Sequence, residues 1–253
     1  MKISIIIPTL NEAANIERLI IHLHKYGGMD LHEIIVSDGG SSDSTLEIAS
    51  NAGAKAVCSE KQGRALQMNL GSNHSTGDIL YFVHADTLPP IEFIAEIQKA
   101  ILKRKKAGCF RFRYDSDKKL LVINSYFTKF NTIFSGGGDQ SLYIQKNVFN
   151  ELGGFDESYV IMEDFDLVSR LRKKRFGLHI IPKEILISAR KYSNNSYLRV
   201  NIANLLVFSL YKMGVKPVKL SGLYKKLLNP FCDMEKLDLK YETKKTFETD
   251  NKI

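Results

Sequence analysis

The sequence contains no tryptophan, few cysteines and no long apolar run. The longest mostly apolar stretch, residues 203–211, is broken by Asn204 and Ser209 and is far shorter than the roughly 20 residues of a membrane-spanning helix. Pro8 follows too few apolar residues for the core of a secretory signal, so we expect a cytoplasmic location. No CxxC pair is present to hold zinc or to act as a dithiol, and the cysteines are expected to be idle thiols. They are Cys58, Cys109 and Cys232.

Acidic side chains are also missing from residues 185–232, which carry eight Lys and Arg. The whole chain has 36 basic and 28 acidic residues, a net charge of +8. Residues 1–98 contain 6 basic and 12 acidic residues, so the excess of positive charge belongs entirely to the second half. This division indicates two separate roles rather than a uniformly basic coat for nucleic acid. We therefore expect no nucleic-acid partner.

The length of 253 residues and the 44% of apolar residues suit one large α/β domain with a sizeable core. The first hundred residues alternate β-branched runs with helical patterns, which is typical of βαβ units around a parallel sheet. In this part we predict strands at residues 3–7, 33–37, 54–58 and 79–83, and helices after Asn11 and at 44–52, 62–73 and 92–105.

The alternation is less regular after residue 106. We predict strands at 107–114, 141–145, 178–181 and 184–188, helices at 120–134, 163–175, 197–215 and 221–228, and a flexible glycine loop at 135–139. The helices at 120–134 and 197–215 are predicted to be amphipathic. These elements suggest a domain at 1–190 with a nucleotide-binding half (1–98) and an acceptor half (99–190), a basic helical extension at 191–232, and a loose tail at 233–253.

Polar clusters follow three of the predicted strands, at residues 8–12 (PTLNE), 38–43 (DGGSSD) and 84–87 (HADT). Ligands of open parallel sheets bind beyond the carboxyl ends of the strands, so these clusters are expected at one edge. Each alone is explained by a helix cap or a turn, which is our interpretation of Asn11 and Asp43. Residues 44–47 match a capping box for the next helix. Neither GxGxxG nor a P-loop follows the first strand, which argues against a dinucleotide fold or a P-loop enzyme.

Six motifs in register resemble glycosyltransferase family 2. They are IIIPTLNE at 5–12, VSDGGSSDST at 36–45, Gly63-Arg64 before ALQMN, HAD at 84–86, GGFDE at 153–157 and Glu163-Asp164. The resemblance covers about residues 1–190 and implies the GT-A fold, a Rossmann-like αβα sandwich with a mostly parallel central sheet. The extension resembles a subgroup found beside radical-SAM and selenium- or arsenic-related genes. The implied activity is inverting transfer from a nucleotide sugar, with a UDP-sugar favoured, to a small or lipid-linked acceptor.

The resemblance assigns the donor site to the first half of the chain. The nucleoside would lie against Pro8 and Thr9, and Glu12 and Asp38 would accept hydrogen bonds from its ribose and base. Asp86 matches the last carboxylate of the DxD element and would hold Mn²⁺ or Mg²⁺ on the diphosphate. His84 replaces the first Asp of that element, and it either favours Mn²⁺ or contacts the ligand without binding metal. The remaining donor-site candidates are Asn11, Gly39, Arg64 and Ala85.

The resemblance makes Asp164 the catalytic base. The helix dipole would keep the pKa of Asp164 low unless the pocket is dry. A structural interpretation remains, because acids are favoured in any first helical turn. Candidates for contact with the acceptor, or for support of the base, are Asp139, Gln140, Glu163 and Arg190. The QxxRW element of processive members is absent, so a non-processive enzyme is expected.

Two alternatives stay open at this point. A nucleotidyltransferase would need a GxGTR-like loop after the first strand, and PTLNE lacks it. A catalytically impaired nucleotide-sugar-binding protein would keep the pocket while His84 disables the metal site. The basic extension either binds an anionic membrane surface through an interfacial helix or folds back over the acceptor site.

Overall fold

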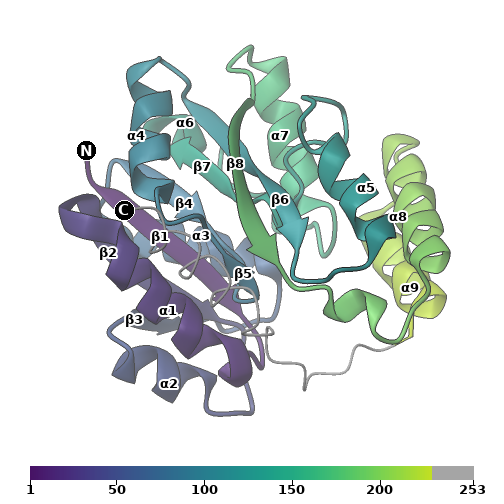
Figure 1. Cartoon of the computed structure of the whole chain (residues 1–253), viewed down its shortest axis with the longest axis horizontal. Coiled ribbons are helices and arrows are strands. Elements are labelled where there is room, and N and C mark those ends of the chain that lie inside the picture. Colours follow the sequence, from purple (N-terminus) through teal and green to yellow (C-terminus); the bar gives the residue numbers. More distant parts are fainter. Residues whose placement is uncertain (230–253) are drawn as a thin grey trace, which may run out of the picture.

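The computed structural model of the chain describes residues 1–229. Within this range, eight strands form one twisted sheet with the order β3-β2-β1-β4-β7-β6-β8-β5, and helices lie on both of its faces (Figure 1). Four strand pairings are parallel and three are antiparallel, so the predicted α/β class with a mostly parallel sheet is confirmed. The strands are β1 (Ile3–Thr9), β2 (Leu31–Asp38), β3 (Lys55–Cys58), β4 (Ile79–Phe82), β5 (Thr87–Leu88), β6 (Ala107–Tyr114), β7 (Leu142–Gln145) and β8 (His179–Ile187).

The first four strands form the parallel part of the sheet and agree with the predicted ranges to within two residues. β1 lies between β2 and β4, and every residue of β1 is buried, as its run of isoleucines predicts. Thr9 at the end of β1 pairs with Asp38 at the end of β2. The carboxyl ends of these strands therefore meet at one edge, where the polar clusters follow.

The second half of the sheet is mixed because β7 is antiparallel to both β4 and β6. β6 pairs in parallel with β8, and the short β5, which was not predicted, pairs with the end of β8. The two strands predicted at 178–181 and 184–188 are one strand. Its register against β6 shifts between Phe110 and Arg111, opposite Pro182, because proline cannot donate to the ladder.

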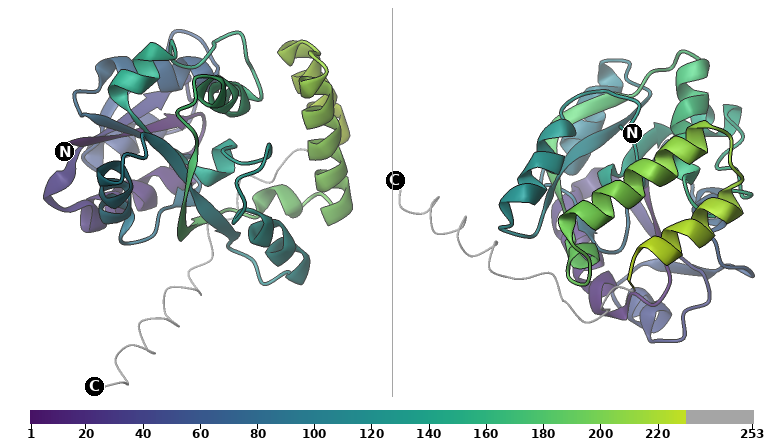
Figure 2. Two further views of the ribbon diagram at one scale, coloured as in Figure 1. Left: turned by 90° about the horizontal axis from the view of Figure 1, so that it is seen from above. Right: turned by 90° about the vertical axis from the view of Figure 1, so that its right-hand side faces the viewer.

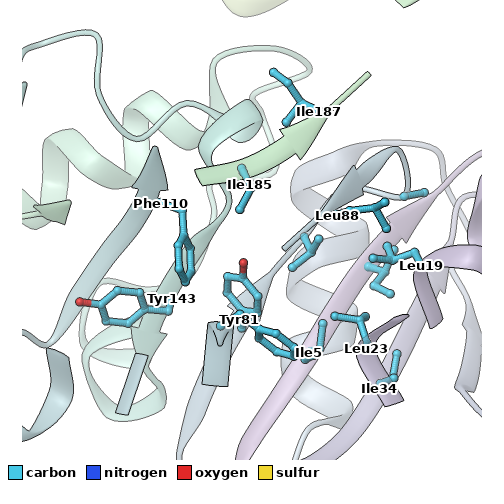
Figure 3. Close-up of a cluster of buried hydrophobic side chains, with 14 of the residues drawn as sticks. Ile5, Leu19, Leu23, Ile34, Tyr81, Leu88, Phe110, Tyr143, Ile185 and Ile187 are labelled. Carbon is cyan, nitrogen blue, oxygen red and sulfur yellow. The ribbon is translucent and has the colours of Figure 1, made fainter. Parts of the chain in front are cut away.

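The helices cover the two faces of the sheet in separate layers. Ile5 and Tyr81 face the layer that contains α1, α4 and the start of α8, whereas Ile6 and Leu80 face the layer of α3, α6 and α7. Figure 3 shows the first layer, in which Leu19 and Leu23 of α1 lie against the sheet. The helices are α1 (Ala13–Gly27), α2 (Thr45–Asn51), α3 (Arg64–His74), α4 (Phe93–Leu102), α5 (Lys119–Phe127), α6 (Lys146–Glu151), α7 (Glu163–Lys173), α8 (Tyr197–Lys212) and α9 (Pro217–Leu227).

The predicted caps of α1 and α2 are partly wrong. Glu12, not Asn11, is the N-cap of α1, and the Asn11 side chain instead accepts a hydrogen bond from Ser42 N. Ser44 makes no side-chain cap, so the capping box does not form. The Asp43 side chain instead accepts hydrogen bonds from the first residue of each helix, from Ala13 N of α1 at 3.2 Å and from Thr45 N of α2 at 3.1 Å.

The segment between β6 and β7 differs from the prediction in two ways. α5 ends at Phe127 instead of residue 134, and among its side chains only Leu121 is buried, so α5 does not bury an apolar stripe. The glycine loop is held in place rather than free. Gln140 is buried, and it accepts from Gly136 N at 2.7 Å and donates to Phe110 O at 3.2 Å.

The extension folds back onto the domain as the helix pair α8 and α9 (Figure 2). Tyr224 on α9 donates to Asn204 on α8 at 2.9 Å, and Arg199 Nε donates to Leu227 O at 2.6 Å. No helix within residues 1–229 is long and apolar enough to cross a membrane. Cys58 is exposed, and burial raises the pKa of Cys109 to about 12. Cys232 and the predicted tail at 233–253 lie outside the described residues.

Candidate functional site

A cavity of about 420 Å³ lies at the edge where β1 and β4 end. Nine of the predicted site residues line this cavity, which we call the donor cavity. They are Pro8, Thr9, Glu12, Arg64, His84, Ala85, Asp86, Asp139 and Arg190. Side chains that sequence reasoning did not single out complete the wall, among them Gln67, Tyr114, Lys191 and Tyr224.

A second cavity of about 390 Å³, which we call the acceptor cavity, adjoins the donor cavity. Both are lined by Arg64, Asp139, Lys191 and Tyr224, so these residues form the boundary between them. The acceptor cavity adds three predicted residues and a set of apolar walls. The predicted residues are Gln140, Glu163 and Asp164, and the walls include Phe112, Phe134, Met162, Phe165, Leu205 and Phe208.

Three predicted donor residues line neither cavity. Asp38 is fully buried, and its carboxylate accepts hydrogen bonds from Thr9 Oγ1 at 2.8 Å and from Ser41 N at 2.7 Å. Gly39 N donates to Thr9 O at 2.9 Å. Asn11 holds the neighbouring Ser42. In this conformation, these residues fix the shape of the loop against which a ligand would lie.

Arg190 links two carboxylates that come from different strand ends. Its NH2 atom lies 2.7 Å from Glu12 Oε1 and 3.1 Å from Asp86 Oδ2, and its NH1 atom donates to Glu12 Oε2 at 3.2 Å. Arg64 and Lys191 also pair with carboxylates. Arg64 Nε lies 3.1 Å from Glu163 Oε1, and Lys191 Nζ lies 3.7 Å from Asp139 Oδ2. The cavities thus bring together three cations.

Asp164 is only 8% exposed, at the first turn of α7. Burial raises its pKa to about 8, with a further increase from the neighbouring Glu163, against the opposing effects of Arg64 and the Gly138 N–H. The low pKa expected from the helix dipole is therefore overcome by burial. The other acid of this turn, Asp166, has a structural partner, because it pairs with Arg170 at 2.7 Å. The structural interpretation thus suits Asp166 better than Asp164.

Gly138 lies between Asp164 and His84. A Cβ atom at this position would be 2.5 Å from His84 Cε1 and 2.7 Å from Asp164 Oδ2, so any side chain here would displace one of these two groups. Burial, with a contribution from Arg64, lowers the pKa of His84 to about 4. The imidazole is therefore neutral at neutral pH, the form in which histidine can bind a metal.

Comparison with known proteins decides the family. The family described as Glycosyl transferase family 2 matches residues 4–153, and Glycosyltransferase like family 2 matches residues 102–206. The chain belongs to glycosyltransferase family 2. This membership agrees with the resemblance of the motifs.

Two curated relatives indicate how far the likeness extends. The probable glycosyltransferase YdaM of Bacillus subtilis is 25% identical over 209 residues, which are 73% of this chain and 50% of that protein. The PGL/p-HBAD biosynthesis glycosyltransferase of Mycobacterium bovis is 27% identical over 183 residues, 64% of this chain and 66% of that protein. The chain therefore spans half to two thirds of the length of these relatives.

Solved structures confirm the GT-A type of fold for this family-2 chain. The mannosyltransferase PcManGT of Pyrobaculum calidifontis, in complex with GDP-Man and Mn²⁺, has a TM-score of 0.63 and 19% identity, with coverage of 89% of this chain and 69% of that chain. TarS of S. aureus in complex with UDP has a TM-score of 0.60 and 16% identity, covering 90% and 70%. At these identities, the likeness concerns the fold alone.

Several residues of this family-2 site could not be identified from the sequence. Gln67 donates to Thr9 O at 2.6 Å and to Ser37 O at 3.0 Å, and Tyr224 closes both cavities from the extension. Gln67 lies within the ALQMN motif but was assigned no role there, and nothing local in the sequence marks Tyr224. The sequence offered a signal for Lys191 and Gly138, because they are the immediate neighbours of the predicted site residues Arg190 and Asp139.

Proposed function

We propose that the chain transfers a sugar from a nucleotide-sugar donor to an acceptor hydroxyl, with inversion and without processivity. The observation that carries this proposal is the junction of the two cavities. The donor cavity has strand-end polar groups and cations suited to a nucleoside diphosphate, and the adjoining cavity contains the buried carboxylate of Asp164. A nucleotidyltransferase is not favoured, since family 2 comprises glycosyltransferases.

The donor is proposed to lie across the strand ends. Its nucleoside would rest against Pro8 and Thr9, on the loop shaped by Asn11, Asp38 and Gly39. Its ribose would donate hydrogen bonds to Glu12, and a uridine nucleotide is favoured, as the resemblance implies. The diphosphate would be held by the cations of the donor cavity. Arginine and lysine are the side chains that most strongly bind phosphate oxygens. The cations of the donor cavity are Arg64, Arg190 and Lys191.

A divalent ion, Mn²⁺ or Mg²⁺, is proposed to bind with the donor, and Asp86 and His84 are the residues that would hold it. Within residues 1–229, no group of three or more His, Cys, Asp or Glu could hold a metal. The protein therefore supplies too few ligands by itself, and donor oxygens must complete the site. A carboxylate and a neutral imidazole fit Mn²⁺ in particular. The ion would neutralise charge on the leaving diphosphate.

Asp164 is proposed as the general base. As the acceptor oxygen bonds to the anomeric carbon, the sugar–phosphate bond breaks, the acceptor proton passes to Asp164 and the nucleoside diphosphate leaves. The raised pKa makes the ionised carboxylate a stronger base. Glu163 and Gln140 would support the base, and Asp139 would contact the acceptor from the boundary between the cavities. The acceptor is proposed to be small or lipid-linked.

Three further assignments from the sequence are part of this proposal. They are the division of the domain at residue 98, membership of the subgroup beside radical-SAM genes, and the cytoplasmic location. The nucleotide-sugar neighbours support the activity, whereas these assignments have the sequence resemblance and the patterning of the chain as their support.

Thermal denaturation with nucleoside diphosphates, in the presence and absence of Mn²⁺, tests the donor site. Saturation at about a hundredfold excess over Kd should raise the Tm by roughly 5–10 °C. Asp164→Asn should keep this shift and lose transfer, whereas the matched variant Asp166→Asn, in the same helical turn, should keep both. No shift with any nucleoside diphosphate would contradict the proposal. Binding without turnover by the wild type would instead favour the impaired binding protein.

A further inference from the structure

Exposed apolar side chains gather on two neighbouring segments of the second half. Of the 21 large apolar side chains exposed within residues 1–229, twelve belong to residues 120–134 and 198–206. These segments contain α5 and the first part of α8. They are in contact, because Asn124 Nδ2 donates to Asn201 Oδ1 at 3.1 Å. Phe134 also contacts Phe208, further along α8, with ring centroids 4.6 Å apart. A patch of this kind marks an interaction surface.

α8 is apolar on two opposite sides, which overturns its prediction as an ordinary amphipathic helix. Val200, Ala203 and Val207 pack into the protein, whereas Leu198 and Ile202 on the other side are 68% and 61% exposed. A surface helix of a globular protein normally has polar residues on the side that faces away from the core. The inner side of α8 is covered by the domain, and the outer side is not (Figure 2).

The charged side chains within these two segments have one sign. Residues 118–134 contain three lysines and no acid, and residues 198–206 contain Arg199 and no acid. A hollow of about 600 Å³ at the start of α5 is lined by Lys118, Lys119 and the polar segment 193–196. Exposed apolar groups bordered by lysines match the two parts of a lipid surface, an apolar interior below anionic headgroups.

The acceptor cavity opens on the same surface. Phe134 and Leu205 line this cavity and are also 52% and 58% exposed, so they form its rim. Asp164 lines the same cavity and is almost fully buried. The path from the exposed apolar surface to Asp164 therefore runs along apolar walls.

We propose that residues 118–134 and 198–206, here called the lipid face, dock on an anionic bilayer and place the mouth of the acceptor cavity against it. An acceptor anchored in that bilayer would present its hydroxyl to Asp164 while its apolar part stays in the lipid. The bilayer is preferred to a protein partner because the charged residues of both segments, Lys118, Lys119, Lys129 and Arg199, are all basic and are interspersed with the exposed apolar groups. This inference rests on the proposed function for the role of the cavity, but not for the docking.

Vesicle sedimentation of the full chain tests the docking. Vesicles with about one third anionic phosphatidylglycerol should bind at about 50 mM salt, and binding should fall roughly tenfold at about 300 mM, since salt screens the attraction. Ile202→Glu should weaken binding roughly tenfold or more. Ile21→Glu is the matched control, because Ile21 is 55% exposed on α1, away from the lipid face (Figure 1).

Two charge-reversal variants, one on the lipid face and one away from it, test the docking independently of the apolar substitution. Lys119→Glu on the lipid face should weaken binding more than fivefold, as each basic residue near an anionic surface contributes about that factor. Lys103→Glu, at the end of α4, should bind like the wild type. Equal binding of Ile202→Glu and Ile21→Glu, or no binding to anionic vesicles, would overturn the proposal. Self-association that Ile202→Glu abolishes, without vesicle binding, would overturn it in favour of a second copy.

Nucleotide binding without vesicles separates the two proposals. Ile202 lines neither cavity, so Ile202→Glu should show the same thermal shift with nucleoside diphosphates as the wild type. If vesicle binding fails while that shift is present, only the docking is wrong. If the wild type shows no thermal shift, the proposed donor site is wrong, and the vesicle result then bears on the docking alone.

Discussion

The raised pKa of Asp164 predicts an unusual pH dependence of activity. A base with a pKa of about 8 is ionised in roughly one molecule in eleven at pH 7 and in one in a hundred at pH 6. The rate of nucleoside diphosphate release should therefore rise about tenfold per pH unit up to about pH 8 and then level off. Steady-state kinetics between about pH 5.5 and 9.5 measures this profile. Asp166→Asn should reproduce it.

The same group also links stability to pH. The folded pKa lies above the unfolded value near 3.8, so the folded state binds the extra proton between these values. The resulting stability is fully present below about pH 4 and is lost as pH rises through about 8, by up to about 1.4 kcal/mol per unit. Asp164→Asn removes the titrating carboxyl and with it this pH dependence, so its Tm should increasingly exceed that of the wild type across this window.

Two results would refute this reasoning. A rate that is flat between pH 6 and 8 would show that the base is already ionised there. Melting curves of Asp164→Asn and wild type that keep a constant separation from pH 4 to 8 would show that the buried carboxyl does not hold the extra proton.

Three further variants test separate parts of the site. Arg190→Gln removes the link between Glu12 and Asp86 and a proposed phosphate contact, so KM for the donor should rise roughly tenfold with a smaller change in kcat; an unchanged KM would contradict this role. Gly138→Ala should lower kcat roughly a hundredfold by separating His84 from Asp164, whereas Gly222→Ala, in open space on α9, should keep full activity. Glu163→Gln removes a like charge that raises the pKa of Asp164, so the break in the pH–rate profile should move to lower pH.

The sequence predicted the parallel part of the sheet well, because its strands are continuous buried runs that end in polar clusters. Parallel strands with right-handed crossovers bring such ends to one edge, so the meeting of Thr9, His84 and Asp86 in one cavity follows from local patterns. The mixed half was less predictable. β7 is antiparallel to both of its neighbours, and nothing in its four residues indicates this direction.

The pairing of side chains within the site could not be predicted. Glu12 and Arg190 are 178 positions apart and are brought together only by the complete sheet. The Asp38 carboxylate accepts hydrogen bonds from Thr9 and Ser41 of the protein itself. The position of Asp38 in a motif did not predict these partners. The pKa of Asp164 depends on its burial beside Glu163 and the glycine loop, and therefore on packing. Likewise, the apolar residues of α5 and α8 predicted amphipathic helices, but not that so many would remain exposed.

The most direct test of the proposed transferase activity is nucleoside diphosphate release from a panel of nucleotide sugars, with Mn²⁺ and Mg²⁺, by wild type, Asp164→Asn and Asp166→Asn. The account predicts saturable release from at least one donor by the wild type and by Asp166→Asn, and loss of that release in Asp164→Asn. Release at the wild-type rate by Asp164→Asn, or no release from any donor by the wild type, would contradict it.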